Sequence, residues 1–361
     1  MKFWRIVPFF QKKISEYVSW KNVKNDNKRY FGMLRKSNIP IKKLSSEQKN
    51  KIDEIYKKFG FRYTYDTHIL AYSVTGKFDE WIMPEDMFRT YIQPTLNDRN
   101  YKVVLSDKGY FELYMPEIKF PDCIIKNIDG CFYDADLNAI TEEKAKEILA
   151  GYDEVVIKPT IENGFGKGVS LVKTMEENPL SLHKKNYIIQ KRVVQHKTFS
   201  ELNESSVNIV RVVTLFLDGE VNVISSALRI GGVGAFTDNA VTSDGKGMIV
   251  VGIDENGKLR ENGYHSCGLK TKQTPNGIAF LGREVYKLDE MFKIAKHQHV
   301  RFPDVKIIGW DFTVDRSGEV VAIEYNLRRP GILYYQYVNG SLFGSLTEKV
   351  CSYANEKTGK R

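Results

Sequence analysis

Cysteine is scarce in this sequence, in which 361 residues include only Cys123, Cys131, Cys267 and Cys351. The four are widely spaced. Cys123 and Cys131 lack both the Cys-x-x-Cys spacing and a nearby histidine, so we do not expect a zinc site. Few cysteines also fit the reducing environment of the cytoplasm. We therefore predict a cytoplasmic protein without a zinc site.

Long apolar runs are absent as well. No stretch of about 18 apolar residues occurs, so no transmembrane helix is predicted. Hydrophobic residues nevertheless make up 42% of the chain and charged residues 27%. That balance predicts a sizeable core, and the length is sufficient for two or three packed units.

The N-terminus combines basic and apolar residues. Residues 1–10 are followed at once by Lys12 and Lys13, so the apolar part is too short for a signal peptide. Residues 3–20 mix aromatic side chains with Arg and Lys, as an interfacial anchor does. The alternative interpretation is a core helix that docks on the first domain.

Acidic residues are fewer than basic residues, which gives a net charge of +9. Many of the lysines lie between residues 12 and 58. A basic front of this kind suits an anionic membrane surface, lipid-linked glycans or acidic saccharides. The protein would then be cytoplasmic and peripheral to a membrane. We do not expect nucleic acid as a partner, because neither an RNA-binding aromatic motif nor a helix-turn-helix is evident.

Three common nucleotide-binding signatures are missing. The sequence has no Gly-x-x-x-x-Gly-Lys-Ser/Thr loop and no strand-linked dinucleotide fingerprint. Protein kinases place their glycine loop before the strand lysine, whereas here Val155-Val156-Ile157-Lys158 precedes the loop. No His-Arg-Asp or Asp-Phe-Gly segment follows in the expected order, and Trp310-Asp311-Phe312 lacks the glycine. P-loop, Rossmann and kinase folds are therefore not predicted.

Near the C-terminus, two apolar runs carry oxygen-bearing side chains. Residues 307–312 and 320–326 are joined by the turn-like Asp315-Arg316-Ser317-Gly318, which predicts a hairpin. Glu324 and Asn326 are two residues apart, so a strand directs both to one face, and Asp311 can face them from the neighbouring strand. Two carboxylates and an amide oxygen on one wall suit Mg²⁺ carrying a nucleotide's phosphates. The alternative is a surface hairpin with ordinary charges, but buried strands rarely carry unpaired acids.

A strand, a glycine-rich loop and a second strand lie upstream. Residues 154–159 form a short apolar run ending in Lys158 and Pro159, residues 163–168 read Asn-Gly-Phe-Gly-Lys-Gly, and residues 169–173 are again apolar. Glycines allow backbone N–H groups to approach phosphate oxygens closely, and Lys158 and Lys167 add positive charge. Taken alone, the loop is equally consistent with a bare hairpin turn.

The order of these parts resembles the ATP-grasp superfamily of carboxylate–amine ligases, most closely its sugar-transfer-associated branch, which is linked to cell-surface polysaccharide biosynthesis. The resemblance covers about residues 100–345. It implies an α+β fold in which two α+β subdomains clasp ATP, here with a mostly helical N-terminal region. The expected units are a helical region at 1–105, a lid subdomain at 106–187, a catalytic subdomain with the metal site at 188–345, and a tail at 346–361.

The resemblance also assigns residues to the nucleotide. Lys108, in Ser106-Asp107-Lys108, matches a lysine that reaches the phosphates, and Lys158 matches the strand lysine at the α-phosphate and adenine edge. The mobile loop that covers the phosphates corresponds to Gly164, Gly166, Lys167 and Gly168. Residues 187–193 match the hinge strand that holds adenine, which implicates Gln190, Lys191 and Val193. Lys197 stands where relatives carry a ribose-binding glutamate, so Gln195 or Glu201 is a substitute candidate.

Further residues match the reaction chamber. Arg211 and Arg229 flank an Asp218-Gly219 turn, which predicts neighbouring strands. In the family such positions face the transferring phosphate, and an arginine fork can hold two oxyanion oxygens at once. Asn239 is expected to touch phosphate or metal. Arg328, beside Arg329, suggests an anionic substrate or a second clamp on the phosphate.

The resemblance implies a reaction that uses ATP and Mg²⁺. A small-molecule or glycan carboxylate would attack the γ-phosphorus to give an acyl phosphate, and an amine would then displace phosphate to form an amide. A uronic acid or amino acid is the expected carboxylate class. Two alternatives remain: an ATP-grasp kinase that phosphorylates a hydroxyl, and a nucleotide-binding scaffold in a glycan assembly complex.

Helical patterns complete the prediction. Residues 1–100 look largely helical, with Ser45 and Gln48 as a capping box. Further helices are expected at 85–96, where Pro94 interrupts the pattern, at 142–150 after a Thr141 cap, and at 283–301. His297 and His299 diverge on such a helix, so they are not expected to bind a metal. The lysine-rich end from Glu356 is expected to fray.

Overall fold

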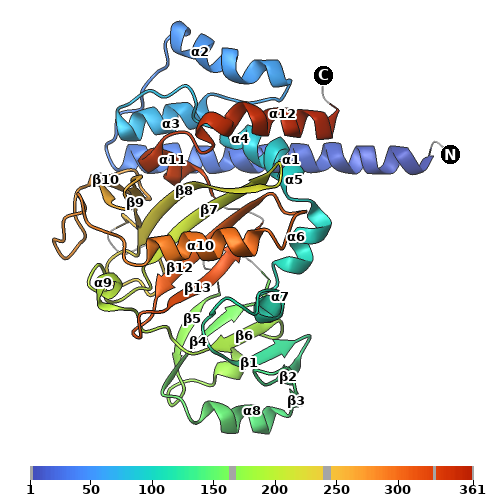
Figure 1. Ribbon diagram of the computed structural model, residues 1–361, viewed down its shortest axis with the longest axis vertical. Helices are drawn as coiled ribbons and strands as arrows, with labels where there is room; N and C mark the ends of the chain where they lie inside the picture. Colours follow the sequence, from blue (N-terminus) through green and yellow to red (C-terminus); the bar gives the residue numbers. More distant parts are fainter. Residues whose placement is uncertain (1–2, 162–167, 239–244, 328–330, 360–361) are drawn as a thin grey trace.

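Two antiparallel sheets lie along the long axis of the molecule, with a layer of helices at one end (Figure 1). The computed structural model describes residues 3–161, 168–238, 245–327 and 331–359. The architecture is α+β, as predicted, and the N-terminal part of the chain is helical.

The smaller sheet has six strands in the order β3-β2-β1-β6-β4-β5. It comprises β1 (Cys123–Ile128), β2 (Cys131–Tyr133), β3 (Ala139–Ile140), β4 (Glu154–Pro159), β5 (Ser170–Lys173) and β6 (Tyr187–Gln190). The helix α8 (Glu142–Leu149) buries Ala145 and Leu149 against one face of this sheet. Its N-cap is Thr141, whose side chain accepts from the N–H of Lys144 at 3.2 Å, so the predicted cap is confirmed.

The larger sheet has seven strands in the order β11-β10-β9-β8-β7-β12-β13. It comprises β7 (Ile209–Leu217), β8 (Glu220–Ile230), β9 (Ile249–Ile253), β10 (Leu259–His265), β11 (Lys270–Thr271), β12 (Ile307–Val314) and β13 (Val320–Asn326). Both hairpins predicted from their turns are present. Asp218 and Gly219 have φ values of 52° and 82°, the left-handed pair that a two-residue hairpin turn requires.

The two faces of the larger sheet pack against different layers. On β12, Ile308, Trp310 and Phe312 alternate with Ile307 and Asp311. The first three residues join the core under α10 (Leu288–His299), whereas Ile307 packs on the side of the N-terminal helices. The period of two therefore directs Asp311 away from α10, toward the helical layer and the smaller sheet.

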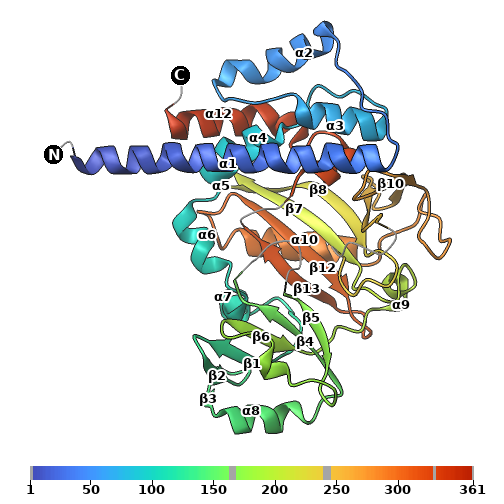
Figure 2. The ribbon, with the colours of Figure 1, turned by 180° about the vertical axis from the view of Figure 1, so that it is seen from behind.

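The helical layer consists of N-terminal and C-terminal segments that lie side by side (Figures 1 and 2). Its elements are α1 (Phe3–Lys36), α2 (Ser46–Tyr56), η1 (Lys57–Phe59), α3 (Asp66–Thr75), α4 (Glu85–Met87), η2 (Phe88–Ile92), α5 (Gln93–Leu96), α11 (Leu333–Asn339), η5 (Gly344–Leu346) and α12 (Thr347–Thr358). The predicted Ser45–Gln48 capping box is present at α2. No helix in the described parts of the chain is long and apolar enough to cross a bilayer.

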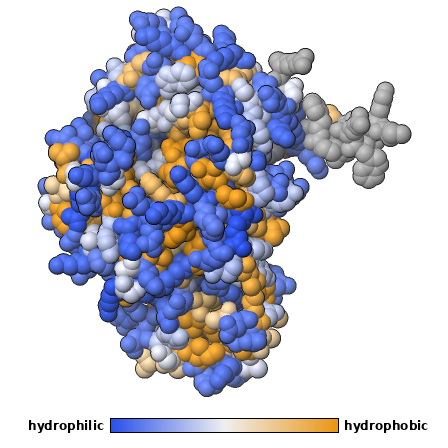
Figure 3. Space-filling view, viewed as in Figure 1, coloured by the Kyte–Doolittle hydropathy of each residue, from blue (hydrophilic) through white to orange (hydrophobic). Residues whose placement is uncertain are grey.

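Short helices connect this layer to the sheets: α6 (Arg99–Leu105), η3 (Lys108–Tyr110), α7 (Phe111–Tyr114), η4 (Pro179–Ser181) and α9 (Lys197–Ser200). The predicted helix at 85–96 is present, but η2 is a π-turn in which the N–H of Gln93 donates to Phe88. This widened turn directly precedes Pro94, which has no N–H to donate. Figure 3 shows that the surface on the side of α10 is largely hydrophilic, with apolar residues gathered toward the middle.

Two predicted boundaries are wrong. The helix expected at 283–301 begins only at Leu288, because Lys287 adopts a left-handed conformation with φ of 63°. The segment expected as a tail at 346–361 instead forms α12, which buries Val350, Cys351 and Ala354 against the N-terminal helices. Fraying therefore does not begin at Glu356, since α12 continues to Thr358.

Candidate active site

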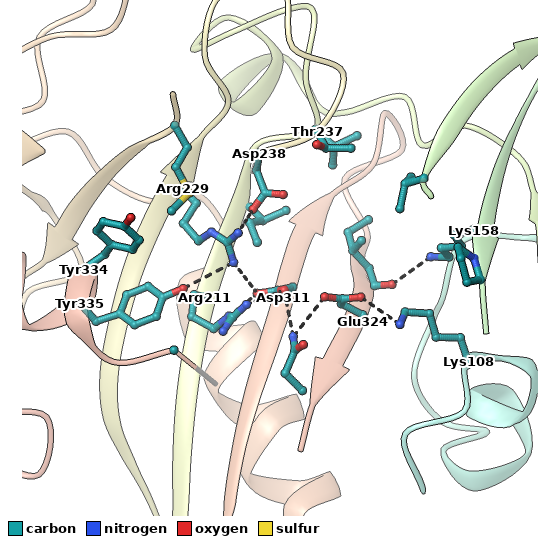
Figure 4. Close-up of a pocket in the computed structure, with 18 of the residues that line it drawn as sticks. Lys108, Lys158, Arg211, Arg229, Thr237, Asp238, Asp311, Glu324, Tyr334 and Tyr335 are labelled. Atoms are coloured by element: carbon teal, nitrogen blue, oxygen red, sulfur yellow. Dashed lines mark hydrogen bonds and ion pairs between the residues drawn. The ribbon is translucent and has the colours of Figure 1, made fainter. Parts of the chain in front are cut away.

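A cavity of about 270 Å³ lies between the two sheets. The smaller sheet contributes Val156, Lys158 and Gln190 to its lining, and the larger sheet contributes Arg211, Arg229, Asp311, Glu324 and Asn326. Figure 4 shows Arg211, Arg229, Asp311 and Glu324 between Lys158 and Lys108 at one end and Tyr334 and Tyr335 at the other. The described structure thus brings six of the charged residues singled out in the sequence into one space, namely Lys108, Lys158, Arg211, Arg229, Asp311 and Glu324.

Asp311, Glu324 and Asn326 form one wall of the cavity. Asp311 pairs with Glu324 in the register of β12 and β13, directly before a bulge in the pairing. The Asn326 amide donates to Asp311 Oδ2 and to Glu324 Oε1, both at 3.2 Å. Asp311 and Asn326 are 3% and 6% exposed. Two strands therefore hold two carboxylates and an amide within hydrogen-bonding reach.

The arginines lie on the neighbouring strands of the same sheet. The guanidinium of Arg211 contacts both carboxylate oxygens of Asp311, through Nε and, at 2.8 Å, through Nη2. Arg229 pairs with Asp238 at 2.6 Å, lies 3.8 Å from Asp311, and donates to the Tyr335 hydroxyl at 3.4 Å. Burial would lower the pKa of each arginine, but Asp311 raises that of Arg211 and Asp238 raises that of Arg229. Both remain cations.

Two lysines face the acidic wall from the opposite side. The Lys108 ammonium is 3.6 Å from Glu324 Oε2, and Lys158 donates to the carbonyl of Ile323 at 3.4 Å. Burial lowers the pKa of Lys158 to about 8, with Lys108 adding to the effect and Glu324 opposing it. Burial alone would raise the pKa of Glu324, but Lys108, Lys158 and Arg211 lower it to about 2. Glu324 is therefore ionised at neutral pH.

The charged residues around the wall of Asp311, Glu324 and Asn326 favour an anion. Lys108, Lys158, Arg211 and Arg229 face the carboxylates of Asp311, Glu324 and Asp238. Burial raises the pKa of Asp238 to about 6, and Asp311 adds to the effect while Arg229 opposes it. The four cations exceed the three carboxylates. A polyanion such as a nucleotide triphosphate, accompanied by a divalent cation, would satisfy both groups of charges.

The wall formed by Asp311, Glu324 and Asn326, here called the oxygen wall, carries the kinds of donor atom that Mg²⁺ prefers. Within the described part of the chain, no three His, Cys, Asp or Glu side chains gather as a metal-binding group. The wall instead offers two carboxylates and an amide, which suits Mg²⁺ because this ion uses few protein carboxylates and keeps several waters. The amide of Asn326 presents its NH₂ group to both acids, so it would have to rotate to offer its oxygen.

The hinge strand lines the cavity at the end formed by the smaller sheet. Gln190 and Val193 contribute to the lining, together with the aliphatic Val156 and Ile323. The Gln190 amide donates to the carbonyl of Pro121 at 3.0 Å, which fixes that side chain. Lys191 also lines the cavity, but its ammonium pairs with Asp122 at 2.9 Å and its N–H donates to Asp122. A flat apolar slot beside a strand suits an adenine ring.

Neither substitute for the ribose glutamate lines the cavity. Gln195 accepts from the N–H of Asn208 at 2.9 Å and donates to Asn208 and Thr313, so it ties the hinge to the larger sheet. Glu201 pairs with Arg283. The ribose contact therefore remains unassigned among the described residues.

Several predicted site residues lie outside the described residues, namely Gly164, Gly166, Lys167, Asn239 and Arg328. Gly168 is described and has a left-handed φ of 80°. A Cβ there would approach Pro159 to 3.0 Å, so this turn requires glycine. Gly168 itself does not line the cavity.

Asp238, directly before the expected Asn239, lines the cavity and pairs with Arg229 on β8. Some other lining residues were not predicted. The other end of the cavity includes Tyr30, Glu85, Arg89 and Gln93, which come from the N-terminal helices. No sequence signal connects these residues to the cavity, because they reach it through packing between segments more than a hundred residues apart.

Two antiparallel sheets that clasp a cavity with a basic lining and an oxygen wall define the ATP-grasp class of proteins. A model of the sugar-transfer associated ATP-grasp family matches residues 87–352. This span is about three quarters of the chain. The chain belongs to the sugar-transfer associated ATP-grasp family, as the sequence resemblance predicted.

The solved structures that match this chain are distant from it in sequence. D-alanyl-alanine synthetase A from Vibrio cholerae is 11% identical, with a TM-score of 0.42 over 70% of this chain and 65% of that one. L-amino acid ligase from Bacillus licheniformis is 12% identical, with a TM-score of 0.39 over 71% of this chain and 49% of that one. The ADP complex of N5-carboxyaminoimidazole ribonucleotide synthetase is 13% identical, with a TM-score of 0.39 over 63% and 46%. This chain thus spans about half to two thirds of their lengths. No curated protein sequence matches it.

Proposed function

We propose that this protein is an ATP- and Mg²⁺-dependent ligase that joins a carboxylate to an amine through an acyl phosphate, in the modification of a cell-surface polysaccharide or glycan. The observation that carries the proposal is the cavity in which Lys108, Lys158, Arg211 and Arg229 face the wall of Asp311, Glu324 and Asn326. Membership of the sugar-transfer associated family supports the glycan context.

The nucleotide would lie across the cavity from hinge to arginines. Its adenine would occupy the slot beside Gln190 and Val193, and its phosphates would extend toward Lys158 and Lys108. When bound at the wall of Asp311, Glu324 and Asn326, Mg²⁺ would neutralise charge on the β- and γ-phosphates. Lys108 would then exchange its contact with Glu324, and Lys158 its bond to the Ile323 carbonyl, for phosphate oxygens.

Arg211 and Arg229 would hold the transferring phosphoryl group. They lie on adjacent strands beside Asp311, at the end of the oxygen wall away from the hinge. Phosphoryl transfer depends mainly on positioning and on stabilising charge that is spread over the equatorial oxygens. A carboxylate oxygen would attack the γ-phosphorus, the bond from this phosphorus to ADP would break, and the acyl phosphate would form.

The second step needs a neutral amine. The pKa of Asp238, which burial raises to about 6, makes this carboxylate a better proton acceptor than an exposed aspartate, and it lies beside Arg229. Asp238 would take a proton from the incoming ammonium. The amine nitrogen would then attack the acyl carbon, the bond to the phosphate oxygen would break, and phosphate would leave beside the arginines with the second proton lost by the nitrogen.

The substrate end of the cavity holds a cluster of ion pairs. Arg89 lies 2.7 Å from Asp26 and 3.8 Å from Glu85, and Asp26 also lies 3.8 Å from Arg29. Arg89, Asp26 and Glu85 line the cavity on the side of Tyr30 and Tyr334. The carboxylates of this cluster would meet the ammonium of an amine substrate, whereas the arginines nearer Asp311 suit the carboxylate of a uronic acid or amino acid.

The decisive experiment measures ADP and phosphate release with Mg·ATP and a panel of amino acids, uronic acids and amines. The carboxylates carry ¹⁸O, because a ligase must transfer one carboxylate oxygen to the released phosphate. Glu324→Gln should abolish turnover. Glu319→Gln is the matched control, since Glu319 lies on the same hairpin with a side chain 63% exposed.

Each outcome identifies one function. Amine-dependent release of ADP and ¹⁸O-labelled phosphate, lost in Glu324→Gln alone, supports the ligase. ADP without free phosphate, together with a phosphorylated alcohol, overturns it in favour of an ATP-grasp kinase. No binding of Mg·ATP by calorimetry overturns both and leaves a scaffold.

A further inference from the structure

The helix α1 extends beyond the rest of the helical layer. It comprises 34 residues, and its N-terminal end projects past its neighbours in both ribbon views (Figures 1 and 2). At 1.5 Å per residue such a helix is roughly 50 Å long. Only part of it is therefore needed to pack against the protein body.

One side of α1 faces the body. Val23, Asn27 and Leu34 are buried, and Leu34 packs in the core with α3 and α11. Glu16 and Asp26, the acidic residues of α1, lie on this inward side: their side chains are 14% and 29% exposed. Asp26 and Tyr30 also line the cavity between the sheets.

The opposite side of α1 is apolar in its N-terminal half. Ile14, Tyr17 and Val18 are 63%, 62% and 48% exposed, and Phe10 is exposed as well. Spacings of three and four residues place them on one face of a helix. Large apolar side chains that gather on one exposed face mark an interaction surface.

Basic residues continue this exposed side of α1 toward its C-terminus. Lys21, Lys24, Lys28 and Arg35 are exposed and follow Ile14 and Tyr17 at helical spacing. Lys24 also lies over the Trp20 ring, 5.1 Å from its centroid, which leaves its ammonium near the surface. With both acids on the inward side, the outward face is apolar for about two turns and then positive for about four.

We propose that this outward face of α1, the α1 face, binds an anionic membrane surface. Apolar side chains would enter the boundary between headgroups and acyl chains, while the lysines would pair with lipid phosphates. A second copy of this chain fits the face less well, because helix pairing along this face would bring lysines at 21, 24 and 28 against one another. An acidic protein partner would satisfy the lysines, but it would leave the exposed apolar residues unexplained.

Membrane binding would also orient the cavity. Asp26 and Tyr30 lie on the side of α1 opposite the proposed contact, and a helix with side chains is about 10 Å across. The substrate end of the cavity would thus lie roughly one helix diameter from the lipid surface. A substrate carried on a membrane lipid would reach it from there.

The test is cosedimentation of the full chain with vesicles of phosphatidylcholine containing about 30% phosphatidylglycerol, compared with pure phosphatidylcholine. We expect binding to the anionic vesicles that weakens with salt. Each basic residue lost should weaken partition onto the anionic vesicles roughly fivefold. Lys21→Glu/Lys28→Glu also adds two negative charges, so it should weaken this partition by at least about 30-fold. Lys293→Glu/Lys296→Glu makes the same change in net charge on exposed positions of α10, on the other side of the sheet, and should bind as the unaltered protein does.

The apolar part is tested by Ile14→Asp/Tyr17→Asp, with Leu281→Asp as control because Leu281 is 70% exposed elsewhere. Loss of vesicle binding in the α1 pair alone, with unchanged thermal unfolding, supports the proposal. Equal binding by all variants overturns it, as does binding to neither kind of vesicle. A dimer in sedimentation equilibrium that Ile14→Asp/Tyr17→Asp dissociates, without vesicle binding, would replace the membrane with a second copy.

Discussion

Arg211 and Asp311 lie opposite each other on adjacent strands, and the guanidinium of one meets both carboxylate oxygens of the other. Both side chains are about 95% buried. A charge in this position is tolerated only because its partner is present. The pair therefore links the stability of the sheet to the chemistry of the cavity.

Asp311→Asn should lower the free energy of unfolding by about 3 kcal/mol, because it leaves the buried Arg211 without an opposing charge at that contact. Urea denaturation followed by fluorescence measures this value. Asp304→Asn is the control, since Asp304 is exposed at the other end of the same segment. An unchanged unfolding midpoint for Asp311→Asn would show that Arg211 finds another partner.

His299 should make the protein sensitive to acid. Its Nε2 donates to the carbonyl of Val305 at 2.8 Å, and its Nδ1 lies 2.7 Å from the hydroxyl of Thr214. Because the carbonyl only accepts, the ring proton is on Nε2 and Nδ1 accepts from Thr214. Burial lowers the pKa of His299 to about 4.

The folded pKa is below the unfolded value near 6.5, so the unfolded state binds the proton first. Stability should fall as pH decreases from about 6.5 to about 4, by about 3 kcal/mol for this residue. Unfolding free energies of His299→Gln should decline less over that range. His297→Gln, at an exposed neighbour, should keep the full decline. Parallel pH profiles for both variants would exclude the role of His299.

Local patterns predicted the parts of the site that depend on local geometry. Glu324 and Asn326 share a face because a strand alternates, and Asp311 meets them because a short turn joins β12 to β13. The same reasoning placed Arg211 and Arg229 on adjacent strands. These features depend only on strand alternation and short turns, so the sequence is enough to predict them.

Other features depend on contacts that no local pattern encodes. β12 pairs with β7, so Asp311 meets Arg211 across about a hundred residues. Glu85 and Arg89 reach the cavity only because the N-terminal helices pack over the larger sheet. The segment after residue 346 has the composition of a tail, yet it forms α12, which buries Val350 and Cys351 against the N-terminal helices. Tertiary packing decided each of these outcomes.

Asn326→Asp should make the stability of the protein depend on Mg²⁺. The amide of Asn326 donates to Asp311 and Glu324, and a carboxylate there would place a third negative charge beside them. We expect a lower melting temperature without metal and a larger upward shift on adding Mg²⁺ than in the unaltered protein. Calorimetry with and without MgCl₂ measures both, and Asn339→Asp, an amide on α11, serves as the control. Equal Mg²⁺ shifts in the three proteins would place the metal elsewhere.

The low pKa of Lys158 predicts how ATP use depends on pH. Burial lowers this pKa to about 8, and the neighbouring Lys108 lowers it further. The ammonium is the form that binds phosphate, so kcat/KM for ATP should fall as pH rises above about 8, approaching tenfold per pH unit. Because bound phosphates favour the charged lysine, kcat at saturating ATP should fall only at higher pH.

Lys158→Arg separates this effect from others, because a guanidinium remains charged throughout the range. Its kcat/KM should be lower than that of the unaltered enzyme at pH 7, since the planar group fits the site differently, but should not decline near pH 8. Lys173→Arg, on the exposed position of the adjacent β5, should retain the decline. If the decline persists near pH 8 in Lys158→Arg, the titrating group is another residue. Asp238, whose pKa burial raises to only about 6, could account for a change at acidic pH but not for one near pH 8.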